Sequence, residues 1–500
     1  MASFDLRANR AILGEKAAAE QRRRSDPRTA ALWRALVLVY MAHARQLRAA
    51  GVVDERGLAA IARALDAVLR AVPEGTRPVS ALLQEAQARA DAVLPAEIAG
   101  AATLGLSRVE TIATALRLRW RESGLAMHEA ALALRAALLE LADAHAVTVM
   151  AAVWGGRPAS PTTLAHFLGG VVGPLALASR RMQQALDVLD RSPLGAGVLA
   201  GDVLEAERET LATALGFAGP IHNTLDALGS VEDLVPLVDA TLAALAAVRR
   251  FVDEVLAWIR TDPTSFFLDE AWEEAPEPSM PALAVSGRLE RLRFALQEAE
   301  LAGRAAIEFA RSLPYGPLGT SWDTLAGMMD DALDRGRSAL AEAQAAVREG
   351  IIVNRAYLAN RAGRQYTTAA DLVPFLMTEE ALPPAAARQI AALVVSRLRE
   401  QHLEASAVTQ DIIDSAALMV IGRELKVEME TLGRYLAPRR FIERRSVLGS
   451  PARERTQEWL RAEREQLDAD RAWAGAQRER WTGALLALEE ALVAAGEIDE

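Results

Sequence analysis

The sequence SPLGAGVLAG, at residues 192–201, is the clearest break in an otherwise helix-forming chain. Its three glycines permit positive φ angles or a close approach between backbones, and Pro193 fixes its own φ and lacks an amide donor. On the residues alone, this stretch is predicted to be a loop between two helices.

Helical periodicity runs on both sides of this loop. Between residues 234 and 255, apolar side chains recur every three or four positions, which predicts a long helix with Pro236 in its first turn. Similar patterns predict long helices within 108–150, 162–190, 285–312 and 321–350. No convincing alternation of apolar and polar residues is found, so strands should be minor. We therefore predict an all-α fold in which long helices pack along their length.

Clusters of glycine and proline divide the chain further. Segment 262–287 contains four prolines and is predicted to be a long mobile loop between two core helices, a kind of loop that is often functional. We predict an N-terminal helical region at 1–107, a central long-helix bundle at 108–350, a C-terminal helical region at 351–460 and a charged amphipathic helical extension at 461–500.

Composition excludes several classes of function. The 500 residues contain no cysteine, which rules out disulfides, a thiolate nucleophile and a Cys-ligated metal. The six histidines lack metal-binding spacing, so we expect no metal and no other cofactor. The sequence shows no signal-peptide pattern and no apolar run of membrane length. We therefore expect a soluble cytoplasmic protein without a membrane partner.

The net charge excludes a further class of partner. The net charge of −11 argues against a nucleic-acid partner, because neutralising phosphates requires a basic face. Paired arginines at 439–440 and 444–445 have acidic neighbours and are predicted to be solvated or to face another subunit.

Several collinear segments resemble one enzyme family. The loop at 192–201 nearly matches a string found at the active-site end of the helical bundle in argininosuccinate lyases of the fumarase/aspartase superfamily. Similar segments follow in the family's order at 40–44, 105–118, 158–166, 215–227, 366–372 and 444–449. The resemblance implies a fumarase/aspartase-like bundle with smaller helical regions at both ends. It also implies a homo-oligomer, expected to be a homotetramer, with a small-molecule ligand in an inter-subunit cleft.

The residues that perform the family's chemistry differ in this chain. In the family, a serine on a mobile loop removes a proton next to a carboxylate, and a C–N bond breaks to release fumarate. When the loop is aligned on Met280-Pro281, Pro278 replaces that serine. Leu283 and Val285 replace the lysine and asparagine that hold the carboxylate, and Gly155 replaces a histidine of the acid/base network.

The same loop is acidic. It contains five carboxylates between Asp262 and Arg288 and no lysine or arginine. A carboxylate substrate entering there would meet like charge, at a cost of about 1–4 kcal/mol for each close contact. Standard argininosuccinate lyase activity is therefore not expected.

The residues that remain define the candidate site. Ser279, one position from the aligned serine, is the candidate catalytic residue; the alternative is an ordinary polar loop residue. The candidate substrate-binding residues are Ser107, Arg108, Trp154, His166, Ser192 and Asn223. Ser107 and Arg108 either bind one anionic group or form a helix N-cap beside a solvent-facing arginine. His166 either lines the cleft or packs in a core. Asn223 either contacts substrate or holds subunits or the glycine-rich loop in place.

Two functions follow from these observations. The first is a lyase-fold enzyme that catalyses a C–N or related β-elimination on an altered substrate. The alternative is a non-catalytic scaffold or regulatory relative of the lyases.

Overall fold

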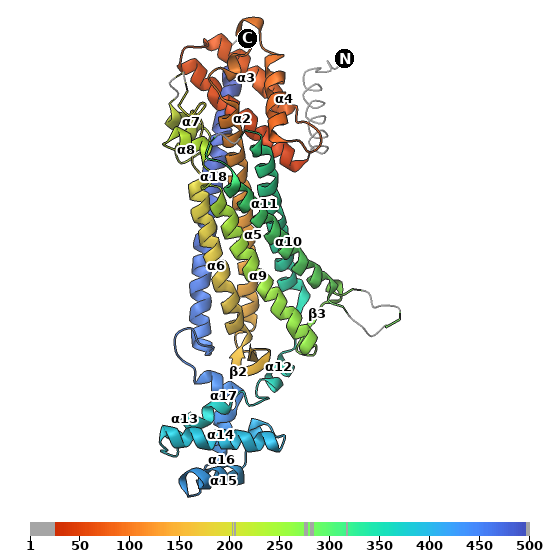
Figure 1. Cartoon of the computed structure of the whole chain (residues 1–500), viewed down its shortest axis with the longest axis vertical. Coiled ribbons are helices and arrows are strands. Elements are labelled where there is room, and N and C mark those ends of the chain that lie inside the picture. The colour runs from red at the N-terminus through yellow and green to blue at the C-terminus, as the bar shows by residue number, and fades with distance from the viewer. Residues whose placement is uncertain are drawn as a thin grey trace, which may run out of the picture.

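The computed structural model describes residues 26–202, 204, 207–274, 279–280, 285–316 and 319–496. Five long helices run side by side along the longest axis of the molecule (Figure 1). They are α5 (Arg108–Ala144), α6 (Leu164–Leu189), α9 (Val235–Thr261), α10 (Gly287–Ser312) and α11 (Ser321–Ala345). Their apolar faces form two contiguous buried clusters, and the predicted all-α bundle is confirmed.

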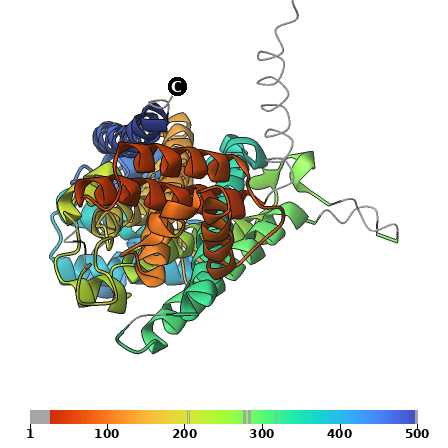
Figure 2. The ribbon, with the colours of Figure 1, turned by 90° about the horizontal axis from the view of Figure 1, so that it is seen from above.

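Short helices cover the upper end of this bundle in Figure 1. They are α2 (Pro27–Ala49), α3 (Glu55–Arg70), α4 (Val79–Asp91), α7 (Arg208–Ala214) and α8 (Thr224–Gly229), with the 3-10 turns η1 (Ala96–Ile98) and η2 (Ala101–Thr103). Seen from above, α2 and its neighbours lie over the end of the bundle (Figure 2).

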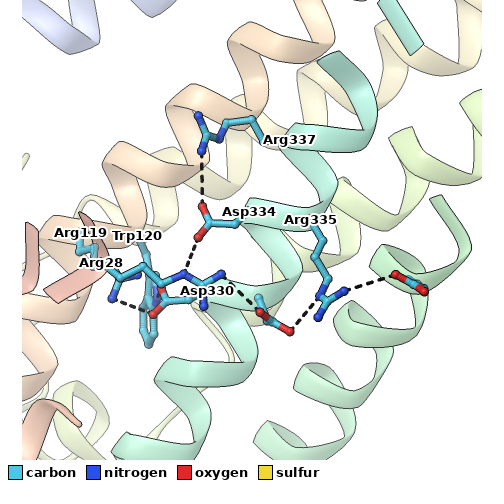
Figure 3. A network of polar contacts seen from close by, with 9 residues as sticks. Arg28, Arg119, Trp120, Asp330, Asp334, Arg335 and Arg337 are labelled. Atoms are coloured by element: carbon cyan, nitrogen blue, oxygen red, sulfur yellow. Dashed lines mark hydrogen bonds and ion pairs between the residues drawn. The ribbon is translucent and has the colours of Figure 1, made fainter. Parts of the chain in front are cut away.

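A charged network fastens α2 to α5 and α11 (Figure 3). The buried Asp330 carboxylate pairs with Arg119 at 2.7 Å and accepts a hydrogen bond from the Trp120 indole at 3.1 Å. Arg28, at the start of α2, donates from Nε to Asp334 at 2.7 Å. Because an unpaired charge in the core would be costly, this pairing fixes how α5 and α11 meet.

The opposite end contains a small helical region with its own apolar core. Its helices are α12 (Arg355–Arg361), α13 (Leu372–Thr378), α14 (Pro384–Glu400), α15 (Gln410–Ile421), α16 (Met429–Leu436) and α17 (Pro438–Glu443), with the 3-10 turns η5 (Ala369–Asp371) and η6 (Ala405–Ala407). Arg444 is exposed and Arg445 half-buried, and both pair with the buried Asp371 carboxylate, because that buried charge requires compensation. That these arginines also face another subunit stays a prediction.

Strands are minor, as predicted. In the described part of the chain, β1 (Val149–Trp154) pairs antiparallel with β2 (Arg157–Thr163), and β3 (Phe266–Leu268) pairs antiparallel with β4 (Ile351–Val353). Gly155 and Gly156 form the two-residue turn of the first hairpin with φ angles of 57° and 76°. Two successive positive φ angles suit a tight hairpin turn and favour glycine at both positions. The 3-10 turn η3 (Glu270–Trp272) and the π-helical turn η4 (Ala346–Gly350) flank β3 and β4.

The last helix, α18 (Arg453–Gly496), returns along the outside of the bundle to α2 and α3 (Figure 1). Buried residues recur at intervals of seven, which gives the helix one narrow apolar stripe. They are Leu460, Leu467, Ala474, Trp481 and Leu488. The expected boundary at residue 460 therefore lies inside this helix. None of the described helices is long and apolar enough to cross a membrane.

Candidate functional site

Residues 192–201, which we call the Gly loop, are held by the first turn of α5. The buried carboxylate of Glu110 accepts hydrogen bonds at Oε2 from the backbone amides of Gly195 at 2.9 Å and Gly197 at 3.0 Å. Its Oε1 accepts from the backbone amide of Ser107 at 2.6 Å. Burial raises the pKa of Glu110, and these amide donors oppose that rise.

Position 197 also requires glycine for a steric reason. Its φ is 61°, and a Cβ placed there would lie 2.2 Å from the carbonyl oxygen of Gly201. Any larger residue would force the two ends of this turn apart. The glycines at both positions therefore allow the loop to close on itself.

Ser107 is the N-cap of α5. Its Oγ accepts from the Glu110 amide at 3.1 Å and donates to the Gly197 carbonyl at 2.6 Å. Together with the Glu110 side chain it forms a capping box. The N-cap alternative for Ser107 is thus observed, and the hydroxyl also ties the helix to the Gly loop.

Arg108 follows directly and is exposed. Within the described ranges it makes no ion pair and no side-chain hydrogen bond. Its guanidinium therefore remains available to an anionic group. The first turn of α5 places this charge where the N-terminal helix dipole also favours an anion.

Ser192 and Asn223 have structural contacts. Ser192 is buried, and its Oγ accepts from the amide of Leu194 at 3.2 Å. The Asn223 side chain caps α8 by accepting from two backbone amides of its first turn. Arg208 completes the support of the Gly loop, since its Nε donates to the Leu194 carbonyl at 3.1 Å.

Trp154 and His166 lie at the other end of the bundle. Trp154, beside the hairpin turn, is 85% exposed. His166 Nε2 lies 3.0 Å from the carbonyl oxygen of Gly449, and Nδ1 lies 2.8 Å from Thr162 Oγ1. Because a carbonyl only accepts, Nε2 holds a proton, and in the neutral ring Nδ1 accepts from the Thr162 hydroxyl.

A cavity of about 680 Å³ lies between the β1–β2 hairpin, α6, α9 and residues 441–451. His166 is part of its wall. A second cavity of about 690 Å³ borders the turn of the hairpin and shares Glu254 and Trp258 with the first. These volumes are typical of small-molecule sites.

Ser279 is exposed and belongs to the segment between β3 and α10. The base of this segment is closed by the Glu274 amide, which donates to the Val285 carbonyl at 2.9 Å. Pro278 and Leu283 lie outside the described residues.

One chain does not bring the candidate residues together. The 37 residues of α5 separate Ser107 from the hairpin, a length of about 55 Å at 1.5 Å per residue. No small molecule spans that distance. Ser107, Arg108, Ser192 and Asn223 belong to the start of α5, the Gly loop and the start of α8, whereas Trp154 and His166 belong to β1 and the start of α6. In Figure 1, α8 lies near the upper end of the bundle and β2 at the lower end.

Two features of the candidate site were not predicted from the sequence. The Ser-x-x-Glu spacing of Ser107 and Glu110 is a recognisable capping-box pattern, yet nothing local shows that the carboxylate also binds the distant Gly loop. The cavities beside α9 depend on tertiary packing and have no local signal. Within the described ranges, no three carboxylate or imidazole groups are placed to hold a metal ion.

Comparison with known proteins agrees with this architecture. Residues 14–275, more than half of the chain, match the lyase family. The argininosuccinate lyase of Methanoculleus marisnigri is 28% identical over 466 residues, covering 90% of this chain and 91% of the relative. The structure of EDDS lyase in complex with formate superposes with a TM-score of 0.83 at 21% identity, covering 96% of this chain and 95% of that one.

A more distant structure, a class II fumarase from Schistosoma mansoni, gives a TM-score of 0.65 at 13% identity over 85% of this chain and 94% of its own. The chain therefore belongs to the lyase family, and its fold is similar to that of the EDDS lyase and the class II fumarase. Within this family, the chain is argininosuccinate lyase-like.

Proposed function

We propose that this protein is a homotetrameric lyase that performs a C–N or related β-elimination on a substrate other than argininosuccinate. The main support is the Gly loop, which Glu110, Ser107 and Arg208 hold in one conformation beside an unpaired Arg108. A fixed backbone next to an available cation is suited to binding one anionic group of a substrate.

Assembly supplies the remainder of the proposed site. Because about 55 Å of α5 separates the two groups of candidate residues, a site that uses both must combine different copies of the chain. The hairpin with Trp154 and His166 would then come from one subunit and the Gly loop from another.

In the proposed reaction, a base removes a proton from the carbon that bears a carboxylate, and the adjacent carbon carries the C–N bond. The electron pair of that C–H bond forms the new C=C bond, the C–N bond breaks, and the amine leaves with a proton. Ser279 is the candidate base, and Arg108 is the candidate partner for the substrate anion. Trp154 would favour a less charged body than a second carboxylate.

The altered substrate follows from the residues at the aligned catalytic positions. Gly155 forms a hairpin turn and has no side chain that could transfer a proton. Val285 is an apolar residue at the base of the Ser279 segment. Neither Gly155 nor Val285 can replace the polar residues that bind and activate argininosuccinate in the family.

A non-catalytic role is the second candidate, and a specific observation favours it. The hydroxyls of Ser107 and Ser192 are both engaged in hydrogen bonds that stabilise the fold. Such a protein would retain the bundle as a scaffold or regulatory partner.

A direct assay separates these possibilities. The purified protein is incubated with argininosuccinate, and fumarate release is followed. In parallel it is incubated with 3-amino-3-phenylpropionate, a monocarboxylate with an apolar body, and cinnamate release is followed. We expect no fumarate release from argininosuccinate at the usual enzymatic turnover of about 1–1000 per second. Cinnamate release that Ser279→Ala abolishes would support the enzyme, and no release from either substrate would favour the scaffold.

A further inference from the structure

We propose that the cavity between the β1–β2 hairpin and α9 binds a zwitterionic amino acid with a large apolar side chain. The inference rests on the lining of this cavity in a single chain. The cavity shares His166 with the proposed substrate site, but the inference does not depend on the proposed β-elimination.

The walls of the cavity are mainly apolar and aromatic. Trp258 forms a fixed part of this surface, because its ring stacks on Phe266 at 4.4 Å between centroids and meets Phe167 edge-on at 4.6 Å. Phe251 and Phe441 lie in the same lining. A bulky apolar group placed here would leave water for a preformed aromatic surface.

Most polar side chains of the lining already have partners. Thr162 and His166 bond to each other, and His166 also bonds to the Gly449 carbonyl. Arg445 pairs with Asp371, and the Ser450 hydroxyl donates to the Arg445 carbonyl. These groups hold the wall together and have little capacity left for a ligand.

Two opposite charges in the lining remain unpaired. Arg250 makes one weak bond, from Nε to the Ala246 carbonyl at 3.3 Å, and its terminal nitrogens have no partner within the described ranges. Glu254 forms no ion pair there either. The two residues are four apart on α9 and so lie on one face, yet no ion pair joins them within the described ranges.

The two opposite charges and the apolar walls together indicate the class of ligand. A carboxylate would pair with the Arg250 guanidinium, and an ammonium group would pair with the Glu254 carboxylate. An amino acid presents both groups at one end and its side chain at the other. The side chain would then lie one further turn along α9, against Trp258.

Calorimetry on the full-length protein tests the inference with four probes. They are L-phenylalanine, 3-phenylpropionate without the ammonium group, phenethylamine without the carboxylate, and glycine without the apolar body. We expect L-phenylalanine to bind about tenfold or more tighter than each of the others, since each loses one charged or apolar contact. Equal affinity for phenylalanine and 3-phenylpropionate, or no binding of any probe, would overturn the proposal.

Variants locate the site. Arg250→Gln should weaken L-phenylalanine binding about tenfold, and Glu254→Gln should do the same while leaving 3-phenylpropionate binding unchanged. Arg304→Gln, which changes an exposed arginine on α10, is the matched control and should bind as the wild type does. If both cavity variants retain wild-type affinity while remaining folded by circular dichroism, the ligand binds elsewhere and the assignment is wrong.

Discussion

Glu110 accepts a hydrogen bond from the backbone amide of Gly197, 87 residues away in the sequence, at 3.0 Å inside the protein. Through this contact the first turn of α5 sets the conformation of the Gly loop. The same carboxylate oxygen binds Gly195, so one buried side chain satisfies two backbone amides.

Replacing that carboxylate tests its role. Glu110→Gln keeps the size of the side chain but exchanges one acceptor oxygen for a donor, so at least one buried amide loses its partner. We expect a loss of stability of about 1–3 kcal/mol, seen as a lower melting temperature, and faster hydrogen exchange in residues 193–201. Glu140→Gln, which removes only an exposed pair with Arg348, is the control. Unchanged exchange in the Gly loop would contradict the assigned role.

Assembly is tested by light scattering. Exposed apolar side chains lie along the bundle, including Leu177 on α6 and Phe294 and Leu301 on α10, and a second copy would cover such surfaces. We expect four times the mass of one chain at micromolar concentration, and smaller species for Leu301→Asp. Met419→Asp, on the outlying α15, should leave the mass unchanged. A monomeric wild-type protein would refute the tetramer.

Arg108 is expected to prefer a singly charged ligand with an apolar body. At equal concentration, trans-cinnamate should raise the melting temperature more than fumarate does, because a ligand specific to the native state stabilises it by mass action. Arg108→Ala should remove this difference, whereas Arg304→Gln, at an exposed position on α10, should keep it. A larger shift with fumarate would show that Ser107 and Arg108 are purely structural.

The loss of folding stability at acid pH should come in part from His128. This residue is fully buried on α5, with its ring edge-on to Trp473 of α18 at 5.4 Å between centroids. Burial lowers its pKa from 6.5 to about 4, while nearby Asp470 opposes and Arg135 reinforces that shift. Because the unfolded chain binds this proton first, the associated stability is complete above about pH 6.5 and is lost as the pH falls towards 4.

The corresponding variant is His128→Leu. The stability of the wild type relative to this variant should fall by about 3 kcal/mol between pH 7 and pH 4, as measured by thermal unfolding. His145 has a pKa lowered to about 4 as well, so the variant itself should retain some acid sensitivity. His222→Asn, at an exposed position, should leave the pH profile unchanged. If the stability of the wild type and of His128→Leu changes with pH in the same way, His128 does not contribute to the acid sensitivity.

Much of the architecture could be predicted from local patterns. The periodicity between residues 234 and 255 and the position of Pro236 predicted α9, because apolar residues three or four positions apart share one face only in a helix. The Gly155-Gly156 break was visible as a turn but not as a hairpin, since the flanking residues do not alternate. Ser107 was recognisable as an N-cap because a serine directly before a helical pattern commonly accepts a hydrogen bond from a backbone amide of the first turn.

The candidate site was less predictable because its contacts join distant parts of the sequence. The bond from Glu110 to the Gly loop spans 85 to 87 positions, and the pairing of Arg444 with Asp371 spans 73. The cavity beside Arg250 and Glu254 exists only once the hairpin packs over α9. Residue spacing predicts a helix face, but it does not predict which other segment will cover that face.

The path of α18 has a consequence for how the protein is made. This helix is synthesised after all the other described elements, and it packs against α2, α3 and α5, which are made well before it. Asp470, the buried partner of Arg135, is therefore missing while those elements are being made. A nascent chain must keep the uncovered side of α5 from associating with other molecules until α18 has left the ribosome, and only then can the bundle close.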